Sequence, residues 1–235
     1  MRGRSILNIA DIEEINEYEI KFLTETHLDQ ILYLQDLVVR DLLDPTSYHV
    51  EPLQFFIKQL AFEKRGLGLF HKNQLVGFHM SSYPDLEEDH LGIDIGLKKE
   101  ELLQCIQLGP VAIHPDHRLN GLLTKVAKRH LRVLEVMGYR HICLTISPNN
   151  FSTLRTTMAH GFIIKKLKLK YNNVLRYILH LDFKNPVKHP QYSVRIPHTD
   201  IESQKFMISL GFYGYDVIKN DNGFDLVFGY DEIKA

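Results

Sequence analysis

The chain has 235 residues, of which 44% are hydrophobic and 24% are charged, the composition of an ordinary soluble globular protein. Its formal net charge is −1, so no bulk positive field exists to attract nucleic acid or an anionic membrane surface. The basic start of the chain lacks the apolar stretch of a signal peptide, and no apolar run approaches the roughly 20 residues that cross a bilayer. Cys105 and Cys143 both lie in apolar runs, which favours buried, reduced thiols in a cytoplasmic protein. We therefore expect neither nucleic acid nor a membrane as a partner.

Before residue 105, the sequence alternates between strand and helix periodicity. It predicts five elements: a strand at 18–23, helices at 26–43 and 51–62, and strands at 66–70 and 74–81. Pro45 ends the first helix, and Pro52 stands in the first turn of the second. Residues 84–104 have no clear periodicity, so we expect an irregular insertion or lid there.

The apolar run Cys105–Ile113 predicts a buried strand that contains Gly109-Pro110, a pair that indicates a bulge or a splayed edge. The loop His114–Arg118 follows. A broad apolar face then predicts a helix from Gly121 to Met137, and Gly138 ends it.

The rest of the chain contains an internal repeat with a period of 50 residues. A strand at 141–146, a helix at 151–160 and a hairpin at 162–182 that turns at Asn172-Asn173 are followed by similar segments in 191–232. Asn150 falls on Asp200, and Gly161-Phe162 falls on Gly211-Phe212. The repeat predicts a second β-α-β-β unit, joined to the first by the proline-containing linker 185–190.

The passage from loop to helix at Gly121 has the properties of an anion site. The first turn of a helix has unpaired N–H groups and a partial positive charge, and phosphate oxygens satisfy both. Gly121 allows close approach to the backbone, and Arg118 adds a bidentate donor. Lys125, Lys128 and Arg129 follow on the same helix, and its first turns carry no acidic residue. The alternative is a solvated basic face on an ordinary helix, and geometry alone leaves both interpretations open.

The segment Leu108–Leu123 resembles the cofactor motif of the GCN5-related N-acetyltransferase (GNAT) superfamily. That motif is Arg/Gln-x-x-Gly-x-Gly/Ala after a strand and a His-Pro-like loop. Arg118 and Gly121 match it, whereas Leu123 replaces the last small residue. The order β-α-α-β-β-β-α-β-α-β-β from about residue 18 to 183 is also that of the family.

A second spacing supports the resemblance. The family often has an Asn eleven residues before a Gly-Phe pair, and Asn150 precedes Gly161-Phe162 by that distance. The resemblance implies acetyl-CoA as cosubstrate, with the pantetheine arm on the backbone of Val111 and Ile113 and the pyrophosphate on the N–H groups of the loop. The implied cofactor-binding residues are Val111, Ala112, Ile113, Arg118, Leu119, Asn120, Gly121, Leu122, Leu123 and Asn150.

The positions where the family keeps catalytic groups hold other residues in this sequence. The Glu eleven residues before the motif Arg is replaced by Gln107, and the Tyr four residues before Gly-Phe is replaced by Thr157. Gln107 can hold a water but cannot act as a base, and Thr157 is a poor acid. His79 and His114 lie near the implied cleft, but we expect each to be structural. Catalytic residues are therefore left unassigned.

Two further patterns are discounted. The thirteen histidines are scattered, and His114-x-x-His117 has only Asp116 as a neighbouring ligand, so no metal site is expected. Lysines alternate with apolar residues over 165–171, which indicates a half-buried strand with a solvated face, although contact with an acidic substrate stays open.

The C-terminal unit has two interpretations. It is either a degenerate copy of the second half of the same fold, or a single module that resembles the vicinal-oxygen-chelate type. Fewer than 50 residues rarely form their own core, so the unit should dock on the main domain or on another subunit as a homodimer contact.

We therefore predict an α/β (α+β) protein. A mixed, mostly antiparallel GNAT-like sheet flanked by helices should span residues 18–184, with a β-α-β-β appendage at 191–235. The leading hypothesis is an N-acyltransferase that moves an acetyl group from acetyl-CoA to a primary amine of a small molecule or protein by direct attack. The competing hypothesis is a catalytically inactive acyl-CoA-binding sensor or scaffold. Residues 40–65 and 84–104 should determine which acceptor is used.

Overall fold

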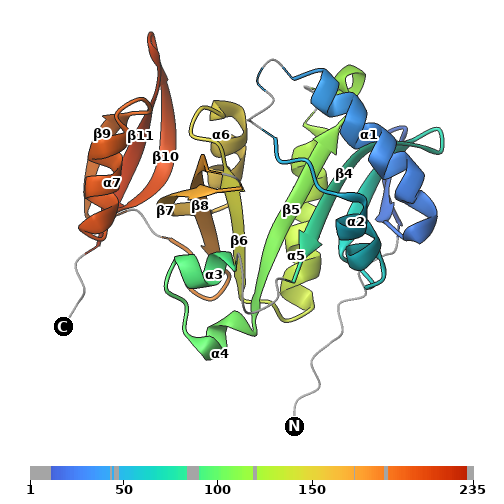
Figure 1. The fold of residues 1–235 in the computed structure, drawn as a ribbon, viewed down its shortest axis with the longest axis horizontal. Coiled ribbons are helices and arrows are strands. Elements are labelled where there is room, and N and C mark those ends of the chain that lie inside the picture. Colours follow the sequence, from blue (N-terminus) through green and yellow to red (C-terminus); the bar gives the residue numbers. More distant parts are fainter. Residues whose placement is uncertain are drawn as a thin grey trace. The chain divides into compact units, whose positions relative to one another are not determined.

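The computed structural model describes residues 12–42, 44, 48–83, 90–118, 121–171, 173–187 and 190–231 (Figure 1). The chain forms two compact units, each built from several segments. The first comprises Met1–Leu43, Val50–Ser82 and Leu108–Tyr139, and the second comprises Asp44–His49, Tyr83–Gln107 and Arg140–Ala235. Among the described residues, no helix has both the length and the apolar character that a bilayer span requires.

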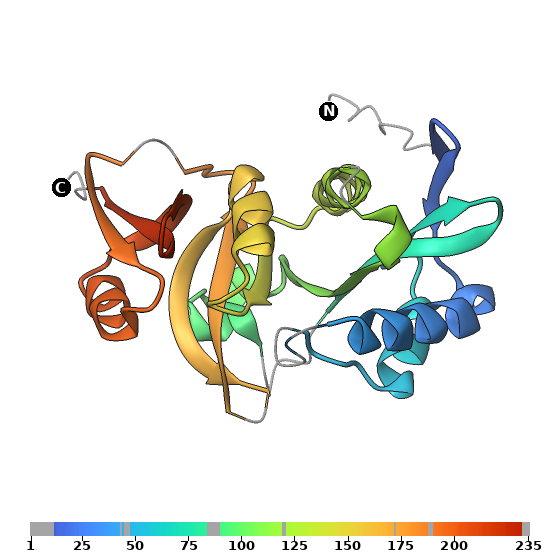
Figure 2. The same cartoon turned by 90° about the horizontal axis from the view of Figure 1, so that it is seen from above.

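The first unit is a sheet with helices on both faces. Its strands lie in the order β1 (Ile12–Ile15), β2 (Tyr18–Phe22), β3 (Gly66–His71), β4 (Gln74–Ser82) and β5 (Cys105–Ile113), of which β5 enters this unit at Leu108. The helices are α1 (Leu28–Arg40), after a 3-10 turn at Glu25–His27, α2 (Leu53–Leu60) and α5 (Leu122–Val136). α1 and α2 cover one face of the strands, and α5 covers the other (Figure 2).

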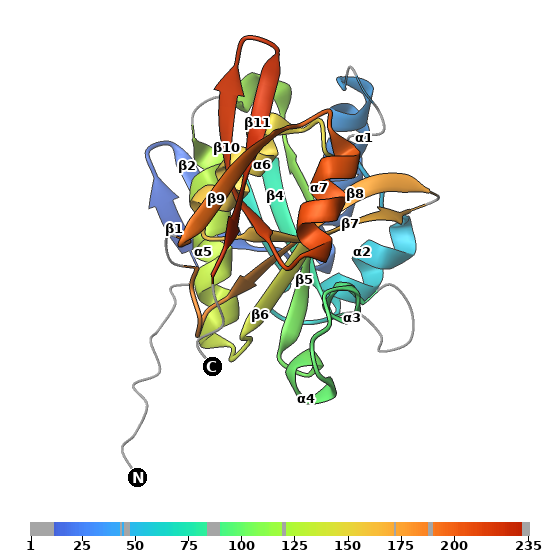
Figure 3. The same cartoon turned by 90° about the vertical axis from the view of Figure 1, so that its left-hand side faces the viewer.

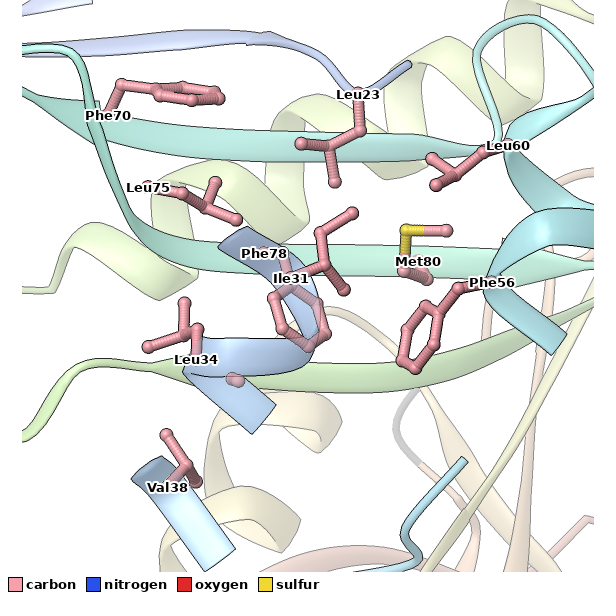
Figure 4. Packing of buried hydrophobic residues seen from close by; sticks show 11 residues of the cluster. Leu23, Ile31, Leu34, Val38, Phe56, Leu60, Phe70, Leu75, Phe78 and Met80 are labelled. Carbon is pink, nitrogen blue, oxygen red and sulfur yellow. The ribbon is translucent and has the colours of Figure 1, made fainter. Parts of the chain in front are cut away.

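The two faces of this sheet bury separate cores. On one face, α1 and α2 pack against β3, β4 and β5 through a cluster that includes Ile31, Phe56, Phe78, Met80 and Ala112, most of them with no exposed area (Figure 4). The apolar stripes of the two helices supply these contacts, as helical periodicity requires. On the other face, a second cluster joins α5 to β2 and β3. These two cores hold the end of β5 and the start of α5 in place.

The second unit contains the remaining strands and helices. They are α3 (Leu91–Asp94), α4 (Lys99–Leu102), β6 (His141–Ile146), α6 (Phe151–Ala159), β7 (Ile163–Lys170), β8 (Val174–Asp182), β9 (Tyr192–Pro197), α7 (Ile201–Ser209), β10 (Tyr213–Asn220) and β11 (Gly223–Tyr230). The strand order is β5-β6-β8-β7-β10-β11-β9. β5 and β6 pair in parallel, whereas β6–β8, β8–β7, β7–β10, β10–β11 and β11–β9 pair antiparallel. The mixed, mostly antiparallel sheet expected from the sequence is confirmed.

Two segments of the second unit repeat the same structure, as the 50-residue period predicts. α7 begins and ends 50 residues after α6, and β10 begins and ends 50 residues after β7. Asn150 and Asp200 cap the two helices alike, because each side chain accepts a backbone N–H three residues later at 3.1 Å. The strand register also shifts at equivalent points, after Ile164 and after Gly214. The second β-α-β-β unit is therefore confirmed (Figure 3).

The two copies meet through equivalent parts. Ile164 of β7 pairs antiparallel with Gly214 of β10, its own counterpart in the repeat. α6 contacts β10 of the other copy, and α7 contacts β7 in return. The buried Tyr177 hydroxyl on β8 donates to Gln204 on α7, which adds a polar contact between the copies. The boundary predicted between residues 184 and 191 falls inside this unit and stays a prediction.

The structure differs from the sequence-based expectations in a few places. Residues 91–94 and 99–102 are short helices, α3 and α4, rather than irregular chain. A strand at Ile12–Ile15 precedes the first predicted one, and Pro52 is the N-cap of α2 rather than a residue of its first turn. β5 continues through Gly109-Pro110, and its register with β6 pairs Cys105–Gln107 with His141–Cys143. Asn172 of the predicted turn lies outside the described residues.

Candidate functional site

The turn from β5 into α5 lies wholly in the first unit and is built around Gly121. A 3-10 turn at Pro115–His117 follows β5, and His114 caps it by accepting the N–H of Asp116 at 3.3 Å. Gly121 is the N-cap of α5 and has a left-handed backbone with φ +65°, which costs glycine little. A Cβ added there would meet no atom within 4 Å, so the space beside this backbone is open. Leu119 and Asn120 lie outside the described residues.

The helix that starts at Gly121 is suited to an anion at its N-terminus. α5 has no acidic residue in its first turn and no side-chain cap, so its first N–H groups point toward the open end of the helix. Leu122 is buried against the core shared by α5, β2 and β3, which fixes the start of the helix. Leu123 is half-buried. The start of the helix is therefore anchored by Leu122, next to the open space beside Gly121.

Arg118 is already engaged in an ion pair. Its guanidinium Nη1 lies 2.5 Å from the Oδ2 of Asp41, which follows the C-terminus of α1, and both side chains are partly exposed. Carboxylate and phosphate oxygens both accept hydrogen bonds from a guanidinium group, so they compete for the same donors. An anionic ligand of the loop must therefore displace Asp41 or share the guanidinium with it.

The basic residues of α5 do not all face solvent. Lys125 and Lys128 are on the exposed side of the helix. Arg129 is 8% exposed and donates to the backbone oxygen of Ile20 at 3.1 Å and to Glu13 at 3.2 Å. Arg129 therefore connects α5 to the β1–β2 hairpin. Of the three basic residues expected on the exposed face of α5, only Lys125 and Lys128 lie there.

The predicted residues Val111, Ala112 and Ile113 lie at the end of β5. Ala112 is buried in the core beneath α1 and α2, whereas Val111 and Ile113 are partly exposed. Gly77 of β4 lies against the Ala112 carbonyl, because a Cβ at Gly77 would sit 3.3 Å from that oxygen. β4 thus lies close along this part of β5, while the ladder to β6 ends at Gln107.

Comparison with solved structures shows what this arrangement is similar to, although the sequence matches no protein-family model and no curated protein. The loading GNATL domain of CurA from Lyngbya majuscula aligns with a TM-score of 0.55 and 16% identity over 72% of this chain and 99% of that domain. An N-acetyltransferase from Staphylococcus aureus aligns with a TM-score of 0.53 and 12% identity over 70% of this chain and 98% of its own. yncA from Salmonella typhimurium, solved with its cofactor acetyl-CoA, aligns with a TM-score of 0.53 and 12% identity over 78% of this chain and 100% of its own. This chain has the GNAT fold. The resemblance inferred from its motifs is confirmed at the level of the fold.

Features that occur in both copies of the repeat indicate which residues have a structural role. Asn150 accepts the N–H of Thr153, and Asp200 does the same for Ser203 in the second copy. Gly161 and Gly211 likewise share a left-handed backbone, with φ of +88° and +92°. A feature kept in both copies is explained by helix capping and chain reversal alone. Asn150 therefore has a structural role through its Oδ1, and a ligand contact would have to use its Nδ2.

The two positions that usually move protons in a GNAT fold hold groups with other roles. The Oε1 of Gln107 accepts the backbone N–H of Leu91 at 2.6 Å, so this side chain fixes the start of α3. Thr157 lies partly buried on α6. Neither side chain offers a proton acceptor that is poised near neutral pH.

The two candidate histidines are held in structural contacts. His79 on β4 is 8% exposed, and its Nδ1 lies 2.8 Å from the Nδ1 of the fully buried His130 on α5. Burial, and then the neighbouring His79, lower the pKa of His130 well below its ordinary value, which favours the neutral imidazole. His114 caps the 3-10 turn before Arg118. Within the described part of the chain, no cluster of His, Cys, Asp and Glu is arranged to hold a metal ion.

Two acidic residues of the first unit, one of them in contact with Arg118, are not indicated by the sequence-based reasoning. Asp41 contacts Arg118 across 77 residues of sequence, and nothing in its neighbourhood in the chain indicates that contact. Glu51 stands directly before α2, where the pattern Glu-Pro indicates only a helix start. Burial raises the pKa of Glu51 to about 7, an effect that only the folded structure creates.

Proposed function

We propose that this chain is an N-acyltransferase that moves an acetyl group from acetyl-CoA to a primary amine by direct attack. The turn from β5 into α5 carries this proposal. Its left-handed glycine, Gly121, its acid-free helix start and the adjacent Arg118 form the kind of cradle that binds a pyrophosphate. In support, yncA shares the fold and was solved with acetyl-CoA.

The pyrophosphate would lie against the N–H groups that precede and begin α5, with Arg118 as a side-chain donor. The pantetheine arm would run along the exposed backbone of β5, where the ladder to β6 has ended. The proposed cofactor-binding residues are Val111, Ala112, Ile113, Arg118, Leu119, Asn120, Gly121, Leu122, Leu123 and Asn150. Ala112 would contribute only through its backbone, since its side chain is buried.

The acceptor is a primary amine of a small molecule or a protein, and the proposed site of action is the cytoplasm. Direct attack needs the amine in its neutral form, a position close to the thioester and a proton for the leaving thiolate. No covalent enzyme intermediate is part of the proposal. Proximity supplies a large part of the rate in such a transfer.

A second candidate function is an acyl-CoA sensor or scaffold that has no catalytic activity. The observation that favours it is the structural use of Gln107 and the lack of a strong acid at Thr157. Isothermal titration with acetyl-CoA followed by a thiol-release assay over a panel of amines distinguishes the two functions. Binding with turnover supports the transferase, binding without turnover on any amine supports the sensor, and no binding contradicts both.

A further inference from the structure

Two histidines lie in the turn that joins β5 to the proposed phosphate cradle. His114 caps this turn, and His117 is its last residue, directly before Arg118. The His114 N–H donates to the Val76 carbonyl of β4 at 2.8 Å, and the His117 N–H donates to the His114 carbonyl at 2.9 Å. The centroids of the two imidazole rings are 5.6 Å apart, and both side chains are partly exposed. The turn therefore holds two imidazoles at defined positions just before Arg118.

The contacts of the two rings determine which nitrogen carries the proton. The Nδ1 of His114 accepts the N–H of Asp116 at 3.3 Å, so the proton of the neutral His114 ring is on Nε2. The Nδ1 of His117 lies 2.9 Å from the hydroxyl oxygen of Tyr18. A phenol hydroxyl is a better donor than acceptor toward an imidazole, so Tyr18 donates and the His117 proton is also on Nε2. Both neutral rings therefore have an Nε2–H group that can donate a hydrogen bond.

The ring of His117 is anchored at the face of the sheet that α5 covers. The Tyr18 ring lies edge-on to it, with 5.6 Å between the centroids, and the centroid of the His71 ring is 5.2 Å away. Tyr18 packs against the apolar cluster that contains Leu122, the first residue of α5 after Gly121. His117 is thus connected through Tyr18 to the start of the helix that forms the cradle.

The acidic residues Glu17 and Asp116, which lie near the two histidines, do not occupy their Nε2–H groups. The Oε2 of Glu17 lies 2.9 Å from the Nε2 of His71, which donates to it. The Asp116 side chain is 85% exposed, and its Oδ2 lies 3.9 Å from the Nδ1 of His114. The hydrogen bond from His71, and to a smaller extent the charge of Lys72, lower the pKa of Glu17. Lys72 therefore adds an exposed cation to the surroundings of the turn.

Acetyl-CoA carries a phosphate monoester on the 3′ oxygen of its ribose, in addition to the pyrophosphate. Such a group has three acceptor oxygens and a charge of about −1.5 to −2 at pH 7. An N–H group bonds more strongly to an ionised acceptor than to a neutral one. We propose that the Nε2–H groups of His114 and His117 bind this 3′-phosphate and so select CoA thioesters over thioesters that lack it. This inference rests on the proposed function, which assigns the neighbouring pyrophosphate to the loop after Arg118.

The test compares acetyl-CoA with acetyl-3′-dephospho-CoA by titration calorimetry on the full-length chain at constant ionic strength. We expect the wild-type chain to bind acetyl-CoA about 10- to 150-fold more tightly, the range expected for hydrogen bonds to a charged group. The H114A/H117A double variant should lose this preference and keep its affinity for acetyl-3′-dephospho-CoA. H117Q retains an N–H donor and should retain part of the preference. K128A is the matched control, because Lys128 is an exposed cation on α5 whose removal should leave the ratio of the two dissociation constants unchanged.

The ratio of the two dissociation constants distinguishes a binding role of the histidines from a structural one. A disturbed turn weakens the binding of both cosubstrates alike, whereas loss of a donor to the 3′-phosphate weakens the binding of acetyl-CoA alone. If thermal unfolding shows that the double variant is not folded, the same ratio is measured on H114A and H117A singly.

Three outcomes contradict the inference. Equal affinities of the wild-type chain for the two cosubstrates would overturn it and leave the proposed function in place. A preference that persists undiminished in the histidine variants would refute the role of His114 and His117. If the wild-type chain binds neither cosubstrate, the proposed function fails together with the inference.

Discussion

The ion pair between Arg118 and Asp41 leads to a prediction about cofactor affinity. The guanidinium holds a carboxylate where a pyrophosphate oxygen is proposed to bind. Replacing Asp41 with Asn removes the competing negative charge and leaves the guanidinium available. D41N should therefore bind acetyl-CoA more tightly than the wild-type chain does.

The size of the effect follows from the exposure of the pair. The side chains are 34% and 43% exposed, and a pair of this kind contributes about 0.2–1 kcal/mol. The dissociation constant of D41N should therefore fall about 1.5- to 5-fold. R118A removes the donor itself, and hydrogen bonds to charged groups are worth about 1.5–3 kcal/mol, so its affinity should fall about 10- to 150-fold.

Titration calorimetry at two salt concentrations measures both effects. D36N is the matched control, because Asp36 pairs with Arg40 at 2.7 Å on the exposed side of α1 and its loss changes the net charge by the same amount. If D41N binds acetyl-CoA no more tightly than D36N does, Asp41 does not compete for Arg118. If R118A keeps wild-type affinity, Arg118 is not a pyrophosphate donor.

Three further predictions concern the loop, the repeat and the acid before α2. G121V should weaken acetyl-CoA binding at least tenfold, whereas G138V should not, because Gly138 has φ +94° and equally open space at the other end of α5. Q204L should lower the free energy of unfolding, measured in urea, by about 1–3 kcal/mol. The change leaves the Tyr177 hydroxyl and the carbonyls of Pro197 and His198 without the Gln204 amide as their partner. An unchanged urea midpoint would show that water replaces the amide. The raised pKa of Glu51 means that the folded chain keeps this proton between about pH 4.5 and 7 while the unfolded chain loses it, so stability falls as pH rises through that window. The free energy of unfolding of E51Q minus that of the wild type should therefore be about 1–2 kcal/mol larger at pH 8 than at pH 4.5, after allowance for the partial exposure of Glu51. The same urea assay measures it, and an equal difference at both pH values would argue against a buried acid at this position.

The sequence predicts most of the fold because local and tertiary signals agree along most of the chain. β5, α5, β6 and α6 lie where apolar periodicity, Gly121 and Asn150 place them. The repeat was also visible, since a capping residue and a Gly-Phe pair recur with the same spacing in both copies. The short helices α3 and α4 were missed because four residues are too few to show a helical period, and the Gln107 contact that fixes α3 is not encoded locally.

The site is less predictable than the fold for a physical reason. The cradle at Gly121 depends on backbone geometry, which a glycine before an apolar helix indicates directly. The states of Asp41 and Glu51 depend on groups that approach from distant parts of the sequence, and neither the ion pair with Arg118 nor the burial of Glu51 leaves a trace in neighbouring residues. The same holds for Arg129, whose position in the sequence suggests a ligand-facing cation and whose guanidinium instead bonds to Ile20.

The pairing of Ile164 with Gly214 has a consequence for assembly. A residue that meets its own counterpart across an antiparallel strand pair lies on a local two-fold axis, so the contact has the isologous form that closes a two-fold homodimer. In this chain both partners are joined covalently, so the contact forms at an effective concentration set by the linker rather than by the amount of protein. Dilution does not weaken it. The edge of β7, which a single copy would leave open to other strands, is covered by β10 of the same molecule.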